Sequence, residues 1–98
     1  MKWIIEYNRT AHKQRNKMPQ KVHFQLDLLA KEMEILGPIR RNWKNFGMLK
    51  KGAKVPEQAF HCHIKKGRPT YVVCWKVICK TKRVIEIYYV GTHEKAPY

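Results

Sequence analysis

Two histidines separated by one residue are the side chains in this sequence best suited to chemistry. Residues 59–64 alternate apolar and polar side chains, which predicts a strand. One face of that strand carries Phe60, Cys62 and Ile64. The other face carries His61, His63 and Lys65. One imidazole can deprotonate a ribose 2′-hydroxyl and another can protonate the departing 5′-oxygen, so this row suits RNA cleavage that needs no metal and no cofactor.

Two other interpretations of the histidine pair remain open. Histidines on a strand are often simply exposed to solvent. A zinc site is the weaker alternative, because Cys62 points away from both histidines and no further ligand stands at a typical spacing.

Three cations follow the histidines within four positions, at Lys65, Lys66 and Arg68. They predict a hairpin tip that can clamp a phosphate. Arg68 is the better transition-state contact, because a guanidinium offers a planar, bidentate fork. A charged turn that keeps the protein soluble is the alternative.

Another ionisable group follows the last apolar strand-like run. His93 can act as an acid or a base near neutral pH, and Glu94 can orient it. Tyr98 can contact the cut nucleotides or stack on a base. The alternative is a frayed polar tail. The predicted catalytic set is His61, His63, Arg68, His93 and Tyr98.

The elements that must position these residues follow the order strand, helix, helix, strand, strand, strand. We expect a strand at 2–7, a short helix at 10–17 with Thr10 as N-cap, and a helix from Pro19 to the Gly37-Pro38 pair. Three strands follow at 59–64, 71–79 and 83–90, with short joins that favour an antiparallel meander. The sequence therefore predicts one α+β domain over residues 1–98, with helices packed on one face of a small sheet.

The second helix carries apolar residues outside its main stripe, at Phe24, Leu28 and Ile35. They require a second covering surface. The favoured interpretation is packing against the short preceding helix, and the alternative is a docking surface for a protein partner.

The segment 39–55 combines glycines, cations and two aromatic anchors, Trp43 and Phe46, and we interpret it as a basic connecting segment. Its lysines and those of the hairpin tip are candidate RNA contacts. The predicted RNA-binding set is Lys44, Lys50, Lys51, Lys54, Lys65 and Lys66.

Net charge points to the class of partner. The chain has 21 Lys and Arg against 7 Asp and Glu, a formal net charge of +14. Such a field attracts polyanions, so we expect binding to nucleic acid or the ribosome. A solvated basic surface and contact with an anionic membrane are the alternatives.

Two further features concern the cell compartment. No secretory signal and no apolar run of roughly 18 residues is present, so we expect a cytoplasmic protein that does not enter a membrane. Three cysteines form an odd set that suits a reducing compartment without disulfides.

These segments resemble the RelE branch of the RelE/ParE toxin superfamily, in the first strand, the helical pair and two C-terminal runs. The runs are FHCHIKKGRPTY at 60–71 and YYVGTHEKAPY at 88–98. The resemblance implies a compact toxin of a type II toxin–antitoxin system that enters the ribosomal decoding site, contacts ribosomal RNA and cuts the mRNA there. It also implies a cognate antitoxin that wraps the toxin.

The resemblance carries over residue by residue. His61 and His63 stand where well-known members hold lysines, and the family's next arginine falls at or near Val72, so Arg68 is the proposed substitute. His93 resembles a C-terminal arginine or histidine, and Tyr98 resembles a terminal tyrosine. The chain stops at Tyr98, without the final helix of some relatives, and the groove left open is a candidate site for an antitoxin segment.

The leading functional hypothesis is therefore a ribosome-dependent mRNA endoribonuclease that inhibits translation. A non-catalytic inhibitor of DNA gyrase, as in ParE-type relatives, is the alternative from another class. A basic RNA-binding module without turnover is the third.

Overall fold

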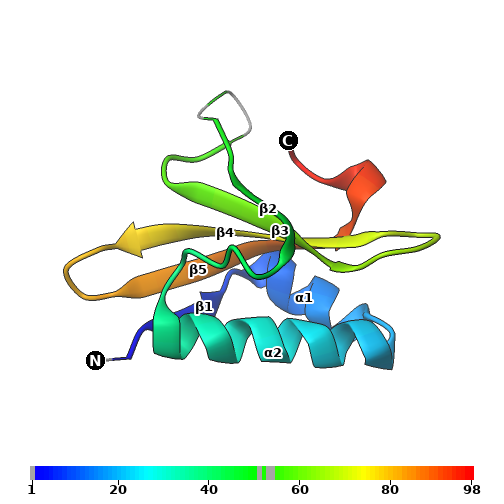
Figure 1. Cartoon of the computed structure of the whole chain (residues 1–98), viewed down its shortest axis with the longest axis horizontal. Coiled ribbons are helices and arrows are strands. Elements are labelled where there is room, and N and C mark those ends of the chain that lie inside the picture. Colours follow the sequence, from blue (N-terminus) through cyan, green and yellow to red (C-terminus); the bar gives the residue numbers. More distant parts are fainter. Residues whose placement is uncertain (1, 51, 53–54) are drawn as a thin grey trace.

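The computed structural model describes residues 2–50, 52 and 55–98, which form two α-helices and a five-stranded sheet (Figure 1). The helices are α1 (Arg9–Lys17) and α2 (Gln20–Leu36). The strands are β1 (Ile4–Tyr7), β2 (Lys44–Met48), β3 (Ala59–Lys65), β4 (Tyr71–Cys79) and β5 (Val84–Thr92), and a 3-10 turn η1 (His93–Lys95) follows. The order across the sheet is β1-β5-β4-β3-β2. β1 runs parallel to β5 and the other pairs are antiparallel, which confirms the α+β class and the meander.

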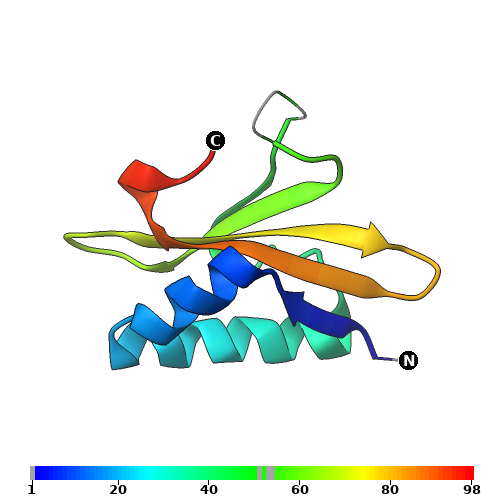
Figure 2. The ribbon, with the colours of Figure 1, turned by 180° about the vertical axis from the view of Figure 1, so that it is seen from behind.

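Both helices lie on one side of the sheet, and the C-terminal tail and the β2–β3 loop lie on the other side (Figures 1 and 2). The main core fills the space between α2 and the sheet. From α2 it receives Val22, Leu26, Leu29 and Met33. We call the other side of the sheet the open face, whose smaller apolar cluster is Val72, Cys74 and Tyr89. Within the described residues, neither α-helix covers this face of the sheet.

Helix α2 leaves one apolar stripe uncovered. Phe24, Leu28 and Ile35 are 61%, 43% and 53% exposed, so the expected packing of these residues against α1 is wrong. Four other positions of α2 are fully buried against the sheet, and the stripe points away from them because a helix repeats every 3.6 residues. The stripe is thus outward-facing surface.

Helix α1 begins one residue earlier than the sequence suggested. Asn8, and not Thr10, is the N-cap, because the Asn8 Oδ1 accepts a hydrogen bond from the Ala11 backbone N–H at 2.8 Å. Both residues are good caps, and only the bond distinguishes them.

The segment that we interpreted as a basic connection contains an edge strand, β2, which the sequence did not predict. A single carboxylate, that of Glu32, binds the segment that precedes this strand. Glu32 on α2 accepts hydrogen bonds from Arg40, Asn42 and Trp43, at 3.3, 2.9 and 2.9 Å. Burial opposes the charge, but these three bonds outweigh it and lower the pKa of Glu32. β2 is thereby held beside β3.

Strand β5 continues to Thr92, two residues beyond the expected end at Val90, and this extension carries the chain towards His93. Gly91 permits this extension because it has no side chain, which leaves room for the Tyr89 side chain. A methyl group added at Gly91 would lie 2.6 Å from the Tyr89 hydroxyl oxygen, which donates a hydrogen bond to the Thr92 carbonyl at 2.7 Å.

We expect Gly91→Ala to destabilise the fold by about 1–3 kcal/mol, because the buried Tyr89 ring must move to make room. Urea unfolding followed by circular dichroism measures the change. Gly52→Ala is the matched control, since its added methyl would meet no described atom within 4 Å. Equal unfolding midpoints for the two variants would contradict this account.

The cysteines occupy two kinds of environment. Cys62 and Cys74 are buried and Cys79 is partly exposed, and all three are free thiols. Burial raises the pKa of Cys74 to about 12, whereas a hydrogen bond with the Thr81 hydroxyl, helped by the Lys82 backbone, lowers the pKa of Cys79.

Neither helix that the structure describes is long and apolar enough to cross a membrane.

Candidate active site

Strand β3 places two imidazoles on the open face. His61 and His63 alternate with Phe60, Cys62 and Ile64, which are buried on the helix side. The neighbouring β2 is tightly packed against them. A Cβ at Gly47 would lie 3.3 Å from the His61 Nε2, and the Asn45 Nδ2 lies 3.4 Å from the His63 Nε2.

The C-terminal segment brings two more rings to the same place. The His93 backbone N–H donates to the Thr70 carbonyl at 2.8 Å, which ties η1 to the start of β4. The ring centre of His93 is 5.3 Å from that of His63, and the ring centre of Tyr98 is 4.8 Å from that of His61. His93 and Tyr98 are 6.1 Å apart. Residues distant in sequence therefore form one cluster of three imidazoles and a phenol.

A groove of about 500 Å³ opens beside this cluster, and we call it the histidine groove. It is lined by His63, Gly67, Arg68, Pro69, Thr70, Thr92, His93 and Glu94. Two imidazoles and a carboxylate thus share a space large enough for part of a nucleotide.

The proximity of the rings changes their proton affinity. Burial, followed by the neighbouring His63 and His93, lowers the pKa of His61. Burial, followed by His93 and Lys44, lowers the pKa of His63. Both rings are therefore neutral at pH 7 and can accept a proton. Burial raises the pKa of Tyr98 to about 12, so its phenol remains a hydrogen-bond donor.

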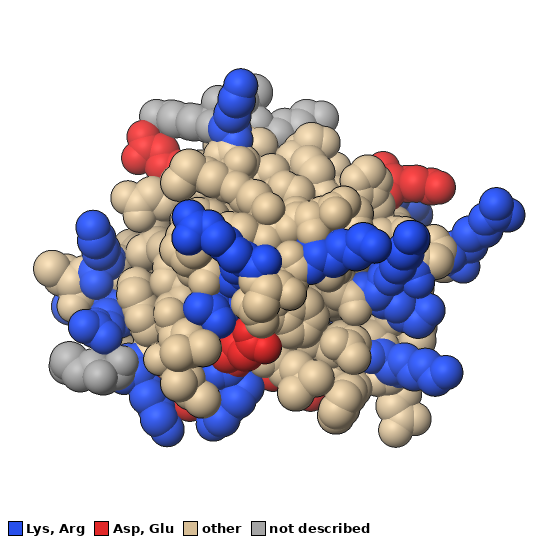
Figure 3. Space-filling model, viewed as in Figure 1, with Lys and Arg blue, Asp and Glu red and all other residues tan. Residues whose placement is uncertain are grey.

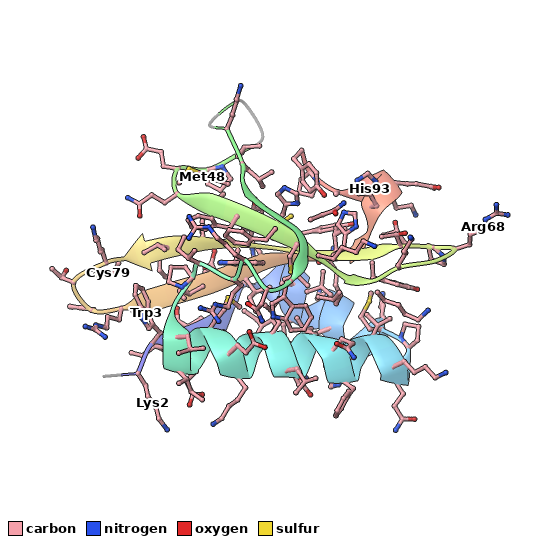
Figure 4. The ribbon with its side chains drawn as sticks, in the orientation of Figure 1. Lys2, Trp3, Met48, Arg68, Cys79 and His93 are labelled. Atoms are coloured by element: carbon pink, nitrogen blue, oxygen red, sulfur yellow. The ribbon has the colours of Figure 1, made fainter. Side chains whose placement is uncertain are left out.

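Arg68 lines the histidine groove, but its side chain lies at the hairpin tip and points away from the cluster (Figure 4). The hairpin is closed by Thr70, whose hydroxyl donates to the Gly67 carbonyl at 3.0 Å. Any contact between the guanidinium and a phosphate at the cluster would need the side chain to turn inward.

The predicted RNA-binding lysines are dispersed. Lys44 pairs with His63 across the β2–β3 ladder, whereas Lys50 and Lys66 are exposed. The strand period placed Lys65 beside the histidines, and its Nζ lies 3.9 Å from the position of a Cβ on Gly67, which lines the histidine groove. The ladder register shifts after His63, and Lys65 lines a separate groove with Ile64 and α2 residues. Lys51 and Lys54 lie outside the described residues.

Basic side chains nevertheless prevail among the charged groups on the face drawn in Figure 3. Lysines and arginines are scattered across this face, with few acidic side chains between them. A polyanion therefore meets favourable charge on this face without a single cationic patch.

Sequence reasoning missed the contribution of β2 to the site. Asn45 and Gly47 contact the two strand histidines, and Asn45 has a left-handed backbone with φ of 55°. The register of the β2–β3 ladder shifts between Lys44 and Gly47. The Asn-Phe-Gly run was the available signal, since asparagine and glycine favour such a bulge. Within the described residues no group of three or more His, Cys, Asp or Glu has an arrangement that would hold a metal ion.

Comparison with known proteins places the architecture in a defined class. No family model matches the sequence, and no curated protein matches it. Solved structures do match: the two helices and five-stranded mixed sheet are the architecture of small bacterial and archaeal toxins.

Three matches illustrate the similarity. A mutant of the E. coli toxin RelE in the free state matches with a TM-score of 0.69 at 21% identity, over 98% of this chain and 88% of that one. The YoeB dimer from Staphylococcus aureus gives 0.71 at 14%, over 95% and 99%. The archaeal RelE–RelB complex from Pyrococcus horikoshii gives 0.66 at 11%, over 98% and 100%. The chain therefore has the RelE-like fold.

Proposed function

We propose that this chain is the toxin of a type II toxin–antitoxin pair and that it cleaves mRNA in the decoding site of the ribosome. The observation that carries the proposal is the cluster of His61, His63, His93 and Tyr98 beside the histidine groove. The RelE-like fold and the net charge of +14 support it. Ribosomal RNA and the mRNA are the polyanions that this charge would meet.

The cluster supports metal-independent cleavage of the phosphodiester bond by transesterification. His63, held neutral by its surroundings, accepts the proton of the ribose 2′-hydroxyl while the 2′-oxygen attacks phosphorus. The bond from phosphorus to the 5′-oxygen breaks, and His93, as the general acid, supplies the proton to that oxygen. The products are a 2′,3′-cyclic phosphate and a free 5′-hydroxyl. His61 and Tyr98, whose rings lie 4.8 Å apart by their centres at a tilt of 37°, contact the nucleotides at the cut.

The state of His63 predicts how cleavage depends on pH. The base must be neutral, and its pKa lies below the ordinary 6.5, so we expect cleavage to be lost only as pH falls below 6.5. Lys44→Gln removes a cation that lowers this pKa, so the acidic limb moves to higher pH. Single-turnover rates on programmed ribosomes measure both profiles, with Lys80→Gln in the β4–β5 turn as the charge-matched control. A limb that stays in place in Lys44→Gln would exclude His63 as the base.

An antitoxin is the proposed protein partner. The archaeal match is a complex between RelE and RelB, and an antitoxin of this chain would have to offset its strong positive charge. Arg68 remains the proposed transition-state contact to the phosphate, which its side chain reaches by turning inward. Lys44, Lys50, Lys65 and Lys66, together with Lys51 and Lys54, remain proposed contacts to RNA.

Primer extension on a defined mRNA, with purified protein and with or without programmed ribosomes, tests the proposal. Cuts in the decoding-site codon that require ribosomes are the expected result. Cuts on naked RNA would indicate a free ribonuclease. No cut under either condition would overturn the proposal and favour a gyrase inhibitor or an inactive binding module.

A further inference from the structure

A second groove on the structure has no role in the chemistry above. It has a volume of about 640 Å³, and we call it the tyrosine groove. Its lining comes from α1, β4, β5, the β2–β3 loop and the C-terminal tail. The lining residues are Asn8, Thr10, Gly52, Val55, Pro56, Lys76, Tyr88, Tyr89 and Pro97.

The tyrosine groove lies next to the histidine cluster along the chain. Pro97 lines the groove, and the ring of the following residue, Tyr98, lies beside that of His61, with ring centres 4.8 Å apart and a tilt of 37°. Neighbouring Cα atoms are about 3.8 Å apart. An RNA strand bound across the cluster therefore reaches the tyrosine groove within a short stretch.

The groove offers an aromatic ring beside a cation. The Lys76 Nζ lies 6.0 Å from the centre of the Tyr88 ring and 3.5 Å from the Glu86 Oε1. Because the Lys76–Glu86 pair is neutral as a whole, this part of the groove has little attraction for a phosphate. An aromatic face with nearby polar groups suits an uncharged nucleobase.

A polar group for the base edge stands at the rim. The Asn8 Oδ1 caps helix α1 by accepting from the Ala11 N–H, so the donor that the Asn8 side chain can offer in the groove lining is its NH₂ group. The Thr10 hydroxyl lies in the same lining. Both groups can hydrogen-bond to the edge of a base whose face contacts Tyr88.

We propose that the tyrosine groove binds the base of a nucleotide next to the scissile bond and so contributes to sequence preference. The inference rests on the proposed function for the position of that bond. Tyr88 supplies the stacking surface, and Lys76 lies beside its ring. Asn8 donates a hydrogen bond to the edge of the base.

Binding of a 2′-O-methyl RNA hexanucleotide, which has no free 2′-hydroxyl to attack, tests the groove without cleavage. Fluorescence anisotropy at fixed salt gives the dissociation constant. We expect Tyr88→Leu to weaken binding about tenfold, because loss of one base–aromatic stack has this size. Tyr88→Phe keeps the ring and stays within about twofold of the parent. Equal affinity of the folded Tyr88→Leu variant and the parent, or equal losses in both variants, would overturn the proposal.

A second measurement uses the unaltered protein and does not depend on how the variants fold. An RNA hexanucleotide with 5-bromouridine at each position is cross-linked by light, and the attached residue is located by mass spectrometry. Attachment at Tyr88 is the expected result, and attachment at Tyr98 without Tyr88 would overturn the inference. Binding at Tyr88 combined with no ribosome-dependent cleavage would separate the two proposals: the groove would stand and the proposed enzymatic function would fail.

Discussion

Replacement of His93 by alanine is expected to lower ribosome-dependent mRNA cleavage by about 10²- to 10⁴-fold, the usual effect of removing a general acid or base. His93 is exposed and lies 5.3 Å from His63 by ring centres, so the change removes a reacting group and little packing. Single-turnover cleavage on programmed ribosomes measures the loss. The thermal unfolding midpoint should remain that of the parent.

Two further variants sharpen this result. His12→Ala changes an exposed histidine on α1 and should leave cleavage unchanged, which controls for loss of an imidazole as such. His63→Ala should lose as much as His93→Ala if the two act as base and acid in one step, and the double variant should lose little more. If a folded variant that lacks both His63 and His93 cleaved mRNA at the parent rate, the proposed chemistry would be excluded.

Replacement of Trp75 by alanine is expected to destabilise the fold by about 3–5 kcal/mol, a large part of the roughly 5–15 kcal/mol typical of a domain. Trp75 is fully buried, and its ring centre is 6.0 Å from Phe46 and 6.2 Å from Phe60. Its indole N–H donates to the Pro38 carbonyl at 3.1 Å. The side chain thus connects β2, β3 and the segment after α2.

Urea unfolding followed by circular dichroism measures this destabilisation. Trp75→Phe is the matched variant, because it keeps an aromatic ring and loses the hydrogen bond and part of the volume. We expect it to cost about 1–3 kcal/mol. An unchanged unfolding midpoint in Trp75→Ala would show that the packing of β2 against β3 does not depend on this residue.

The long elements could be predicted because their side-chain periods are unambiguous. The apolar spacing that ends at Gly37 fixed α2, and β4 spans the residues expected from its apolar run. β2 could not be predicted in the same way. Its five residues include Asn45 and Gly47, which have low strand propensity, and it is held in place by tertiary bonds from Glu32.

The candidate site was predictable in its residue types and less so in its geometry. The period of two put His61 and His63 on one face, and the structure adds His93 and Tyr98 through the long β5 and the turn η1. Arg68 and Lys65 show the limit. The cations predicted the hairpin tip, but the outward direction of the Arg68 side chain and the register shift after His63 have no periodic signal in the sequence.

The distribution of thiols makes the natural sequence ready for single-site labelling. Cys62 and Cys74 are buried with raised pKa values, whereas Cys79 has a lowered pKa and lies at the end of the β4–β5 hairpin far from His93 (Figure 4). A maleimide dye reacts with thiolates and would therefore select Cys79. The protein can carry a fluorescent reporter, which would test the proposed binding to the ribosome, without a substitution and without a bulky group beside the histidines.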